Sequence, residues 1–258
     1  MPPLSSRRAL VTGGGRGIGR AVALDLGRAG AAVAVAARTR AEVDAVAAEL
    51  RRGGALAAAV TMDVTDPASV RAAFAAARES LGAIDILVSG AGIAPTAPLA
   101  RTSDEMWRQV LETNLSGTFY GLREALPEMT ARGWGRVVNL ASIAGKTGYP
   151  YIAAYAASKH GVLGLTKCAA LEVATSGVTV NAVCPGYVDT PMLDVGVARI
   201  VEKTGLSPEE ARRRLADMSP QKRLYTVDEV SALVLFLCTE AAAGINGQAL
   251  SVDGGTVV

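Results

Sequence analysis

The chain has 258 residues, of which half are apolar, and a formal charge of +2 from 26 Lys and Arg against 24 Asp and Glu. This length and composition predict one large globular α/β domain and argue against disorder. The charges are spread without a long basic run, so we expect no nucleic-acid partner. No stretch approaches the roughly 20 apolar residues of a membrane span, so we expect no membrane partner either.

The N-terminal stretch and the cysteines bear on location. The apolar run after Arg7 and Arg8 ends within a few residues at glycines, which is not typical of a signal peptide. Cys168, Cys184 and Cys238 are odd in number and lack CxxC spacing. This pattern predicts buried, reduced thiols in a cytoplasmic protein, and neither a disulfide framework nor a metal site.

Short apolar runs alternate with longer helical patterns along the whole chain. The seven runs predicted to be buried strands are residues 8–13, 31–37, 56–64, 85–92, 135–142, 178–186 and 248–255. Helices are predicted near residues 17–29, 39–53, 66–81, 102–132, 151–175 and 226–241. Strict alternation of this kind indicates right-handed crossovers and a single domain, residues 1–258, built as a Rossmann-type doubly wound parallel sheet with helices on both faces.

A glycine-rich loop, VTGGGRGIG, follows the first predicted strand and opens the first predicted helix. Gly13, Gly17 and Gly19 allow a tight turn and a close approach to a pyrophosphate, at which the helix N-terminus points its N–H groups. The spacing runs TGxxxGxG from Thr12 to Gly19 and differs from GxGxxG. The loop's place between a strand and a helix predicts dinucleotide binding.

The end of the second predicted strand indicates which dinucleotide binds. An NAD site usually has an acidic residue about 20 positions past the glycine loop, where it binds the ribose 2′-OH. This chain has Ala36 and Ala37 there, followed by Arg38, and Arg16 lies inside the loop. Two guanidinium groups suit a phosphate dianion, so the predicted cofactor is NADP(H). The alternative is that Arg38 is only a solvated charge at the start of the next helix.

Tyr155 and Lys159 lie four residues apart in the segment AAYAASKHG. In a helix this spacing puts both side chains on one face. A free phenol has a pKa of about 10, and an ammonium about 4 Å away supplies roughly the 4 kcal/mol needed to bring it to neutral pH. A solvated Tyr/Lys pair is the alternative, and His160, the only histidine, is directed elsewhere, which argues against a serine-hydrolase triad.

Several motifs in order along the chain make it resemble the short-chain dehydrogenase/reductase family. They are TGxxxGxG at 12–19, Asp63, GAG at 90–92, Asn114, Ser142, YAASK at 155–159, PG at 185–186 with Thr190, and INGQALSVDGG near the end. The resemblance implies that Tyr155 is the general acid, that Lys159 lowers its pKa and holds the nicotinamide ribose, that Ser142 binds the substrate oxygen and that Asn114 holds a water in a proton relay. Without the family, Ser142 is an ordinary strand-end serine and Asn114 a helix residue bonded to its own backbone.

The cofactor-binding residues that the motifs and the resemblance predict are Gly13, Gly15, Arg16, Gly17, Ile18, Gly19, Arg38, Asp63, Val64, Gly90, Ala91, Gly92, Tyr155, Lys159, Pro185, Gly186, Val188 and Thr190. One position departs from the family pattern. Ser89 and Gly90 stand where family members commonly carry two asparagines that brace the central sheet and the adenosine side.

The longest break in the alternation, approximately residues 186–225, is predicted to be a substrate lid. SPEE at 207–210 is a capping box with Pro208 at the first helical position. Six apolar side chains are predicted to face the nicotinamide end: Tyr187, Met192, Leu193, Val195, Val197 and Ile200. Basic residues of the same segment either meet the phosphates of a thioester substrate or form a solvated face: Lys203, Arg212, Arg213, Arg214, Lys222 and Arg223.

The chain resembles β-ketoacyl and polyketide ketoreductases in particular, from GRVVNLAS through YAASKHG to VNAVCPGYVDTPM. This resemblance implies NADPH-dependent reduction of a ketone, a 3-oxoacyl thioester or similar β-keto compound, in a homotetramer. A secondary-alcohol or 3-hydroxybutyrate-type dehydrogenase is the alternative activity. A non-catalytic dinucleotide sensor on the same fold is the alternative from another class.

Overall fold

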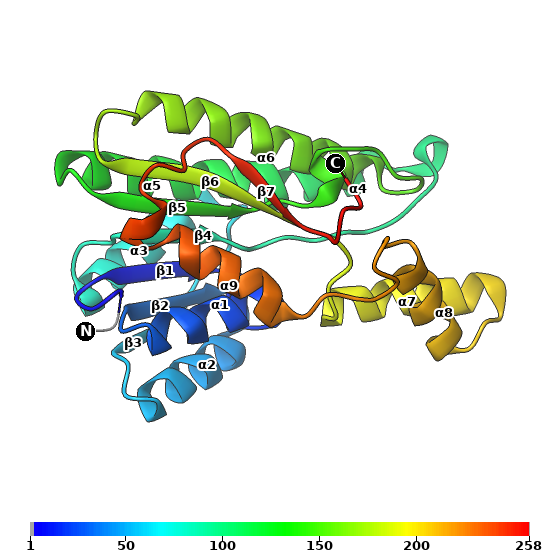
Figure 1. The fold of residues 1–258 in the computed structure, drawn as a ribbon, viewed down its shortest axis with the longest axis horizontal. Coiled ribbons are helices and arrows are strands. Elements are labelled where there is room, and N and C mark those ends of the chain that lie inside the picture. Colours follow the sequence, from blue (N-terminus) through cyan, green and yellow to red (C-terminus); the bar gives the residue numbers. More distant parts are fainter. Residues whose placement is uncertain (1–2, 258) are drawn as a thin grey trace.

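The computed structural model describes residues 3–257 as one seven-stranded sheet covered by helices on both faces (Figure 1). The strands are β1 Arg8–Thr12, β2 Ala32–Ala37, β3 Ala57–Thr61, β4 Ile86–Ser89, β5 Gly135–Leu140, β6 Val178–Pro185 and β7 Ala249–Val252. The main helices are α1 Gly17–Arg28, α2 Arg40–Arg52, α3 Pro67–Leu81, α4 Asp104–Leu111, α5 Gly117–Ala131, α6 Ala153–Glu172, α7 Pro191–Thr204, α8 Pro208–Asp217 and α9 Val227–Leu237. The predicted fold class is confirmed.

The strand order is β3-β2-β1-β4-β5-β6-β7, and every neighbouring pair is parallel. The order reverses between β1 and β4, because the chain builds outward from β1 in one direction and then in the other. In open α/β sheets ligands bind at such a reversal, beyond the carboxyl ends of the strands. The topology therefore predicts a ligand-binding crevice where the glycine loop and the end of β4 meet.

Two apolar cores hold the helices to the sheet. One lies between the sheet and α1, α2 and α9, and the other lies between the sheet and α3, α5 and α6. Alternate strand residues feed the two cores: Val11 faces the first and Leu10 the second. Burial on both faces explains why the strands read as continuous apolar runs rather than as alternating ones.

The long helix predicted over residues 102–132 is divided in the structure. It consists of α4, a π-helical turn over Glu112–Ser116 and α5. Such turns insert an extra residue into a helix and are frequent at functional sites. This one carries Asn114.

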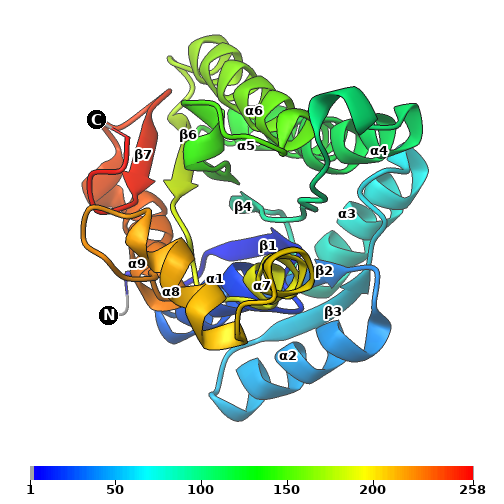
Figure 2. The same cartoon turned by 90° about the vertical axis from the view of Figure 1, so that its right-hand side faces the viewer.

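The predicted lid projects from the body of the molecule as α7 and α8 (Figures 1 and 2). The capping box that begins α8 is confirmed: the Ser207 hydroxyl accepts from the Glu210 N–H at 3.2 Å, and the Glu210 carboxylate accepts from the Ser207 N–H at 2.8 Å. A cap of this kind stabilises a helix by about 1 kcal/mol. In the described residues, no helix is long and apolar enough to cross a membrane.

Candidate active site

Tyr155 and Lys159 lie on one face of α6, as their spacing predicts. The Lys159 Nζ atom is 5.7 Å from the centroid of the Tyr155 ring. Lys159 is buried, and its Nζ donates to the Leu140 carbonyl oxygen at 2.6 Å. Because Leu140 ends β5, this bond fixes the lysine at the carboxyl edge of the sheet.

Burial controls the acidity of both side chains. It lowers the pKa of the Lys159 ammonium to about 8, and the carbonyl that accepts from Nζ carries no full charge to oppose the shift. Burial also raises the pKa of the Tyr155 phenol, and a hydrogen bond with the Ser142 hydroxyl opposes that rise. A Tyr155 pKa lowered by Lys159 therefore stays a prediction.

Ser142 lies just beyond the end of β5 and is nearly buried. Its hydroxyl accepts from the Ala144 N–H at 3.1 Å and so begins the short 3₁₀ turn Ile143–Gly145. A Cβ atom at Gly145 would lie only 2.8 Å from the Lys159 carbonyl oxygen, so this turn packs closely on α6. The close packing brings Ser142 against the phenol.

Asn114 is completely buried and is bonded to groups outside its own helix. Its amide accepts from the Ile93 N–H at 2.9 Å and donates to the Ile93 carbonyl at 2.9 Å. It also donates at 3.0 Å to the hydroxyl of Ser158, which in turn donates to the Tyr155 carbonyl at 2.7 Å. Asn114 thus joins the loop after β4 to the backbone of α6.

Sequence reasoning did not assign a role to Ser158, Ile93 or Leu140. Ser158 stands next to Lys159 in the motif, but its spacing gave no sign of a contact with Asn114. Ile93 and Leu140 act through main-chain atoms, which every residue has, so no side-chain signal marks them.

The glycine loop lies directly against the loop that follows β4. A Cβ atom at Gly13 would lie 2.7 Å from the Ala91 nitrogen, and one at Gly19 would lie 2.2 Å from the Gly13 carbonyl oxygen. Gly13 and Gly17 have positive φ angles of 65° and 54°. Within residues 3–257 no side chain caps the N-terminus of α1, so its N–H groups point into the crevice. These features fit a pyrophosphate.

The adenosine side of the crevice is formed by the ends of β2 and β3. The Asp63 carboxylate accepts from the Thr65 N–H at 3.0 Å and the Thr65 hydroxyl at 2.8 Å. The Thr65 backbone bond is the main cause of the lowered pKa of Asp63, and the positive charge of Arg38 contributes to it. Arg38 is therefore near enough to Asp63 for its charge to act on the carboxylate.

Glu42, in the first turn of α2, is a carboxylate that the sequence analysis overlooked. Its Oε2 atom lies 3.0 Å from the position that a Cβ of Gly15 would occupy. An acid on the glycine loop could bind a ribose hydroxyl and would repel a 2′-phosphate. The negative charge of Glu42 thus disfavours the 2′-phosphate that the positive charge of Arg38 favours.

The remaining predicted cofactor residues lie at the carboxyl ends of the strands, in the loops that follow them or in the first turn of α1. A Cβ at Gly117 would lie 2.9 Å from Val64, and a Cβ at Gly92 would lie 3.3 Å from the Asn114 Oδ1. Pro185 ends β6, and Gly186 follows it against Tyr225. Val188 is buried, Ile18 is half-buried in the first turn of α1, and Thr190 lies 3.6 Å from the Cβ position of Gly17. These residues fit a nicotinamide dinucleotide.

Gly90 and Thr12 explain part of the departure from the family pattern. A Cβ at Gly90 would lie 2.7 Å from the Thr12 carbonyl oxygen, so this backbone leaves no room for a side chain. The Thr12 hydroxyl accepts from the Gly90 N–H at 3.0 Å and from the Ala91 N–H at 3.4 Å. The Ser89 hydroxyl is buried and has no hydrogen-bond partner among the described residues. Thr12 therefore joins the end of β1 to the loop that follows β4, beside the two positions that depart from the family pattern.

Four of the six apolar lid residues pack with α8, so a contact with the nicotinamide end stays a prediction. Leu193, Val197, Ile200 and Tyr187 pack in a small separate core with residues of α8. Met192 and Val195 remain exposed. The amphipathic pattern of α7 is explained by helix-on-helix packing, so it carries no information on the substrate.

Three of the six basic residues of the lid bond to other groups of the protein. Arg212 bonds to Asp189 at 2.7 Å and also to Asp194, and Arg223 forms a two-pronged pair with Glu229 at 2.6 and 2.8 Å. Lys222 donates to the Asp217 carbonyl at 2.7 Å. Lys203, Arg213 and Arg214 are exposed. Of the six predicted thioester-binding cations, Arg212 and Lys222 are therefore engaged within the lid, and Arg223 is engaged with α9.

One lid residue reaches across to the loop after β4. The Arg199 guanidinium, on α7, donates to the Thr96 hydroxyl at 2.7 Å and to the Thr96 carbonyl at 3.2 Å. The next residue, Ala97, donates its N–H to the Tyr151 carbonyl at 2.8 Å, just before α6. Arg199 thereby ties the lid to the loops that surround Tyr155.

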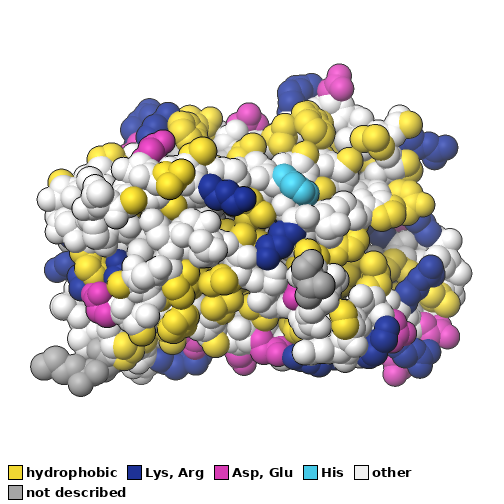
Figure 3. Space-filling view, turned by 45° about the horizontal axis from the view of Figure 1, so that its top comes forward, with side chains coloured by type: hydrophobic (Ala, Val, Ile, Leu, Met, Phe, Trp, Pro, Cys, Tyr) yellow, Lys and Arg dark blue, Asp and Glu magenta, His cyan; other side chains and the backbone are white. Residues whose placement is uncertain are grey.

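The other chemical candidates in the sequence are the one histidine and the three cysteines. His160 is exposed, as the cyan side chain on the surface in Figure 3 shows, and its Nδ1 pairs with the Ala156 carbonyl at 2.9 Å. All three cysteines are free, and Cys184 and Cys238 are buried as expected. Cys168 is exposed on the outer face of α6, which corrects the expectation that all three thiols are buried. Residues 3–257 contain no cluster of His, Cys, Asp and Glu suited to a metal ion.

A doubly wound sheet with a dinucleotide crevice and an adjoining Ser, Tyr and Lys group defines a class of nicotinamide-dependent oxidoreductases. Residues 7–198 match the family described as short chain dehydrogenase. The chain belongs to this family, and the resemblance expected from the sequence is confirmed.

Known proteins align with nearly the whole chain. The crystal structure of a variant of the actinorhodin polyketide ketoreductase with NADPH is 41% identical, with a TM-score of 0.95 over 99% of each chain. A predicted ketoacyl reductase 1 of the granaticin polyketide synthase of Streptomyces violaceoruber is 41% identical over 96% of this chain and 92% of that protein. The D-beta-hydroxybutyrate dehydrogenase of Rhizobium meliloti is 37% identical over 97% of this chain and 98% of that protein.

Proposed function

We propose that the protein is an NADPH-dependent carbonyl reductase that converts the ketone of a 3-oxoacyl thioester, or a similar β-keto compound, to the hydroxy product. The observation that carries this proposal is the convergence of Ser142, Tyr155, Lys159 and Asn114 at the carboxyl edge of β5, beside the glycine loop. A sensor that only binds the dinucleotide would have no need of this arrangement.

The Ser142 hydroxyl and the Tyr155 phenol are the donors for the substrate carbonyl oxygen. When bound, NADPH supplies the hydride. Ser142 orients the carbonyl, and the Tyr155 O–H donates the proton that the oxygen gains as it becomes a hydroxyl. The Lys159 ammonium, held at Leu140 and near Gly92, stabilises the negative charge that the phenol acquires. In the oxidative direction the same tyrosine accepts the proton.

Asn114 positions this group in the proposed mechanism. Its three hydrogen bonds hold Ile93 and Ser158. A Cβ at Gly92 would lie 3.3 Å from the Asn114 Oδ1 and 3.8 Å from the Lys159 Nζ, so the amide and the amine are neighbours. This nearness supports a role for Asn114 in a proton path behind Lys159.

The preference for NADP(H) over NAD(H) depends on the opposite charges of Arg38 and Glu42. Arg38, with Arg16 in the glycine loop, supplies the positive charge that suits a 2′-phosphate, whereas Glu42 disfavours it. The related ketoreductase structure holds NADPH. We expect kcat/KM to be higher with NADPH than with NADH, and an NADH value equal to or above that of NADPH would contradict the assignment.

The relatives favour a β-keto substrate. Two of them are described as ketoacyl or polyketide ketoreductases, and both align with almost the entire chain. The experiment compares acetoacetyl-CoA with simple aryl and alkyl ketones in NADPH oxidation. Thioester turnover no better than that of an unrelated ketone would contradict the acyl assignment, and cofactor binding without any turnover would favour a sensor.

A second candidate is a 3-hydroxybutyrate-type or other secondary-alcohol dehydrogenase. The observation that favours it is the similarity to the Rhizobium meliloti enzyme over nearly its full length. Oxidation of D-3-hydroxybutyrate with NAD⁺ that is faster than acetoacetyl-CoA reduction with NADPH would select this candidate.

We further propose that the chain forms a homotetramer. Leu171 on α6, Phe119 on α5 and Trp107 on α4 are 78%, 41% and 40% exposed, and Phe236 on α9 is 42% exposed. Large exposed side chains on two opposite sides of the sheet suit two different subunit contacts. Light scattering measures the mass in solution, and a monomer would contradict the proposal.

A further inference from the structure

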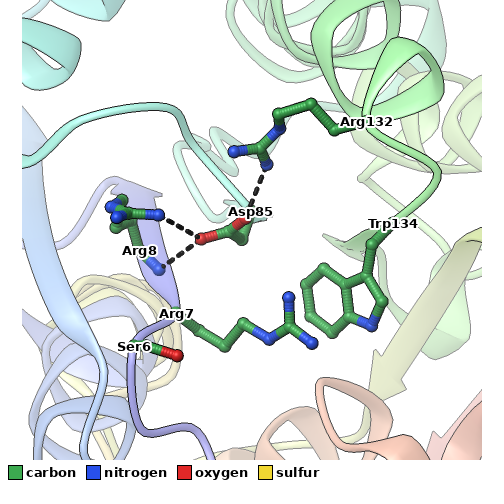
Figure 4. Close-up of a pocket in the computed structure, with 6 residues that line it drawn as sticks. All are labelled: Ser6, Arg7, Arg8, Asp85, Arg132 and Trp134. Atoms are coloured by element: carbon green, nitrogen blue, oxygen red, sulfur yellow. Dashed lines mark hydrogen bonds and ion pairs between the residues drawn. The ribbon is translucent and has the colours of Figure 1, made fainter.

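A hollow at the amino edge of the sheet is not used by the proposed reaction. It has a volume of about 350 Å³. The residues that line it are Ser6, Arg7, Arg8, Asp85, Arg132 and Trp134 (Figure 4). Arg8 begins β1, Asp85 precedes β4 and Trp134 precedes β5. Because Tyr155 and the glycine loop lie beyond the carboxyl ends of these strands, the hollow is separated from them by the length of a strand, about 15–20 Å.

The Asp85 carboxylate in the hollow forms ion pairs with two arginines, Arg8 and Arg132. The Asp85 side chain is 5% exposed. One of its oxygens accepts from the Arg8 N–H at 2.9 Å and lies 3.5 Å from the Arg8 Nη1. The other accepts from the Arg132 Nη2 at 2.5 Å. Figure 4 shows these bonds as dashed lines, with both guanidinium groups directed at the one acid. Asp85 therefore orients the two arginines and leaves an excess of positive charge.

Arg7 is held from the opposite side. Its guanidinium carbon lies 3.5 Å from the centroid of the Trp134 ring, and its Nη2 is 3.3 Å from the Glu240 Oε1. The Trp134 Nε1 donates to the same Glu240 oxygen at 2.6 Å. Arg136 lies over the same ring at 4.5 Å and reaches the second Glu240 oxygen at 3.2 Å. Stacking and ion pairing thus fix the plane of the Arg7 group before any ligand arrives.

The charges of this cluster do not cancel. Arg7, Arg8, Arg132 and Arg136 face Asp85 and Glu240, so four positive charges meet two negative ones. The side chains of Arg7, Arg8 and Arg132 are each about one third exposed, at 32%, 38% and 32%, so their remaining donors are open to solvent. Forked guanidinium donors match the oxygens of a phosphate, and an excess of two charges matches a dianion.

We propose that this hollow, which we call the amino-edge arginine site, binds a phosphate-bearing anion. The anion lies between Arg7 on one side and the Arg8 and Arg132 pair on the other. The site differs from the cofactor crevice in both place and residues, so the two are expected to be occupied together.

The test is calorimetric titration of the whole protein with pyrophosphate. Saturating NADP⁺ fills the cofactor crevice, and KCl keeps the ionic strength constant. We expect saturable binding with a dissociation constant below about 1 mM. Arg7→Ala and Arg132→Ala should each weaken it at least about tenfold, which is the usual effect of losing one charge-assisted hydrogen bond. The matched control is Arg108→Ala, which removes an exposed α4 arginine with one ion pair, to Glu105 at 3.5 Å, and should leave binding unchanged.

Fluorescence locates the ligand. The chain has two tryptophans, so in Trp107→Phe the emission comes from Trp134 alone. We expect pyrophosphate to change this emission over the concentration range of the calorimetric curve. Binding that does not saturate below about 10 mM, or that is equally tight in Arg7→Ala and Arg132→Ala, would overturn the proposal and leave only a structural ion-pair cluster. If Arg132→Ala fails to fold because Asp85 loses a partner, Arg7→Ala decides the question, since Arg7 does not contact Asp85.

Discussion

Replacing Lys159 by methionine should stabilise the protein while it removes activity. Lys159 is 5% exposed, and burial lowers its pKa from 10.5 to about 8. This change corresponds to about 3 kcal/mol by which the folded protein disfavours the ammonium. Methionine has a similar length and no charge, but it leaves the Leu140 carbonyl without its Nζ donor, which costs about 1–2 kcal/mol. The net gain at pH 7 is therefore about 1–2 kcal/mol.

The pH dependence separates this explanation from better packing. Below pH 8 the folded wild type carries the buried ammonium, so the full gain of the variant is present. Above pH 10.5 the amine is neutral in both the folded and the unfolded chain, so the gain disappears as the pH rises from 8 to 10.5.

Thermal unfolding of the cofactor-free protein, followed by circular dichroism at several pH values, measures the effect. At pH 7 we expect a Tm increase of about 3–6 °C, since 1 kcal/mol shifts the Tm by about 2–4 °C in a chain of this size. Ketone reduction should fall at least about a hundredfold. A variant that is less stable than wild type at pH 7, or whose advantage is the same at pH 7 and pH 10.5, would refute the reasoning.

Three further predictions concern the proposed roles. Tyr155→Phe should lower kcat more than tenfold, because the transferable proton is lost. The NADPH dissociation constant should stay within about threefold of the wild-type value. A kcat above about a tenth of wild type would contradict the general-acid role. Arg38→Ala should lower kcat/KM about tenfold with NADPH and leave the NADH value nearly unchanged, whereas an equal loss with both cofactors would show that Arg38 does not read the phosphate. Arg199→Ala should release the lid from Thr96, which should raise the substrate KM severalfold and speed proteolysis within residues 186–225. An unchanged KM together with an unchanged rate of proteolysis would contradict the role of Arg199 in holding the lid.

The fold and most of the candidate site could be predicted from local patterns in the sequence. Continuous apolar runs identified all seven strands, because a parallel sheet buries both of its faces. The glycine loop was recognisable because a tight turn and a close backbone approach at Gly13 and Gly19 require glycine. The spacing of Tyr155 and Lys159 placed both on one helix face, and SPEE identified the start of α8. In each of these patterns, neighbours along the chain determine the geometry.

Contacts between distant segments became visible only in the folded molecule. Lys159 is held by the Leu140 carbonyl and Asn114 by the backbone of Ile93, and main-chain atoms leave no mark in a sequence. Glu42 reaches Gly15 only because α2 packs beside the glycine loop. The apolar stripe of α7 predicted a buried face, but whether that face meets the substrate or α8 depends on the path of the chain after residue 204. The sequence could not predict these contacts, because the side chains and the backbone atoms that form them are brought together only by the packing of separate elements.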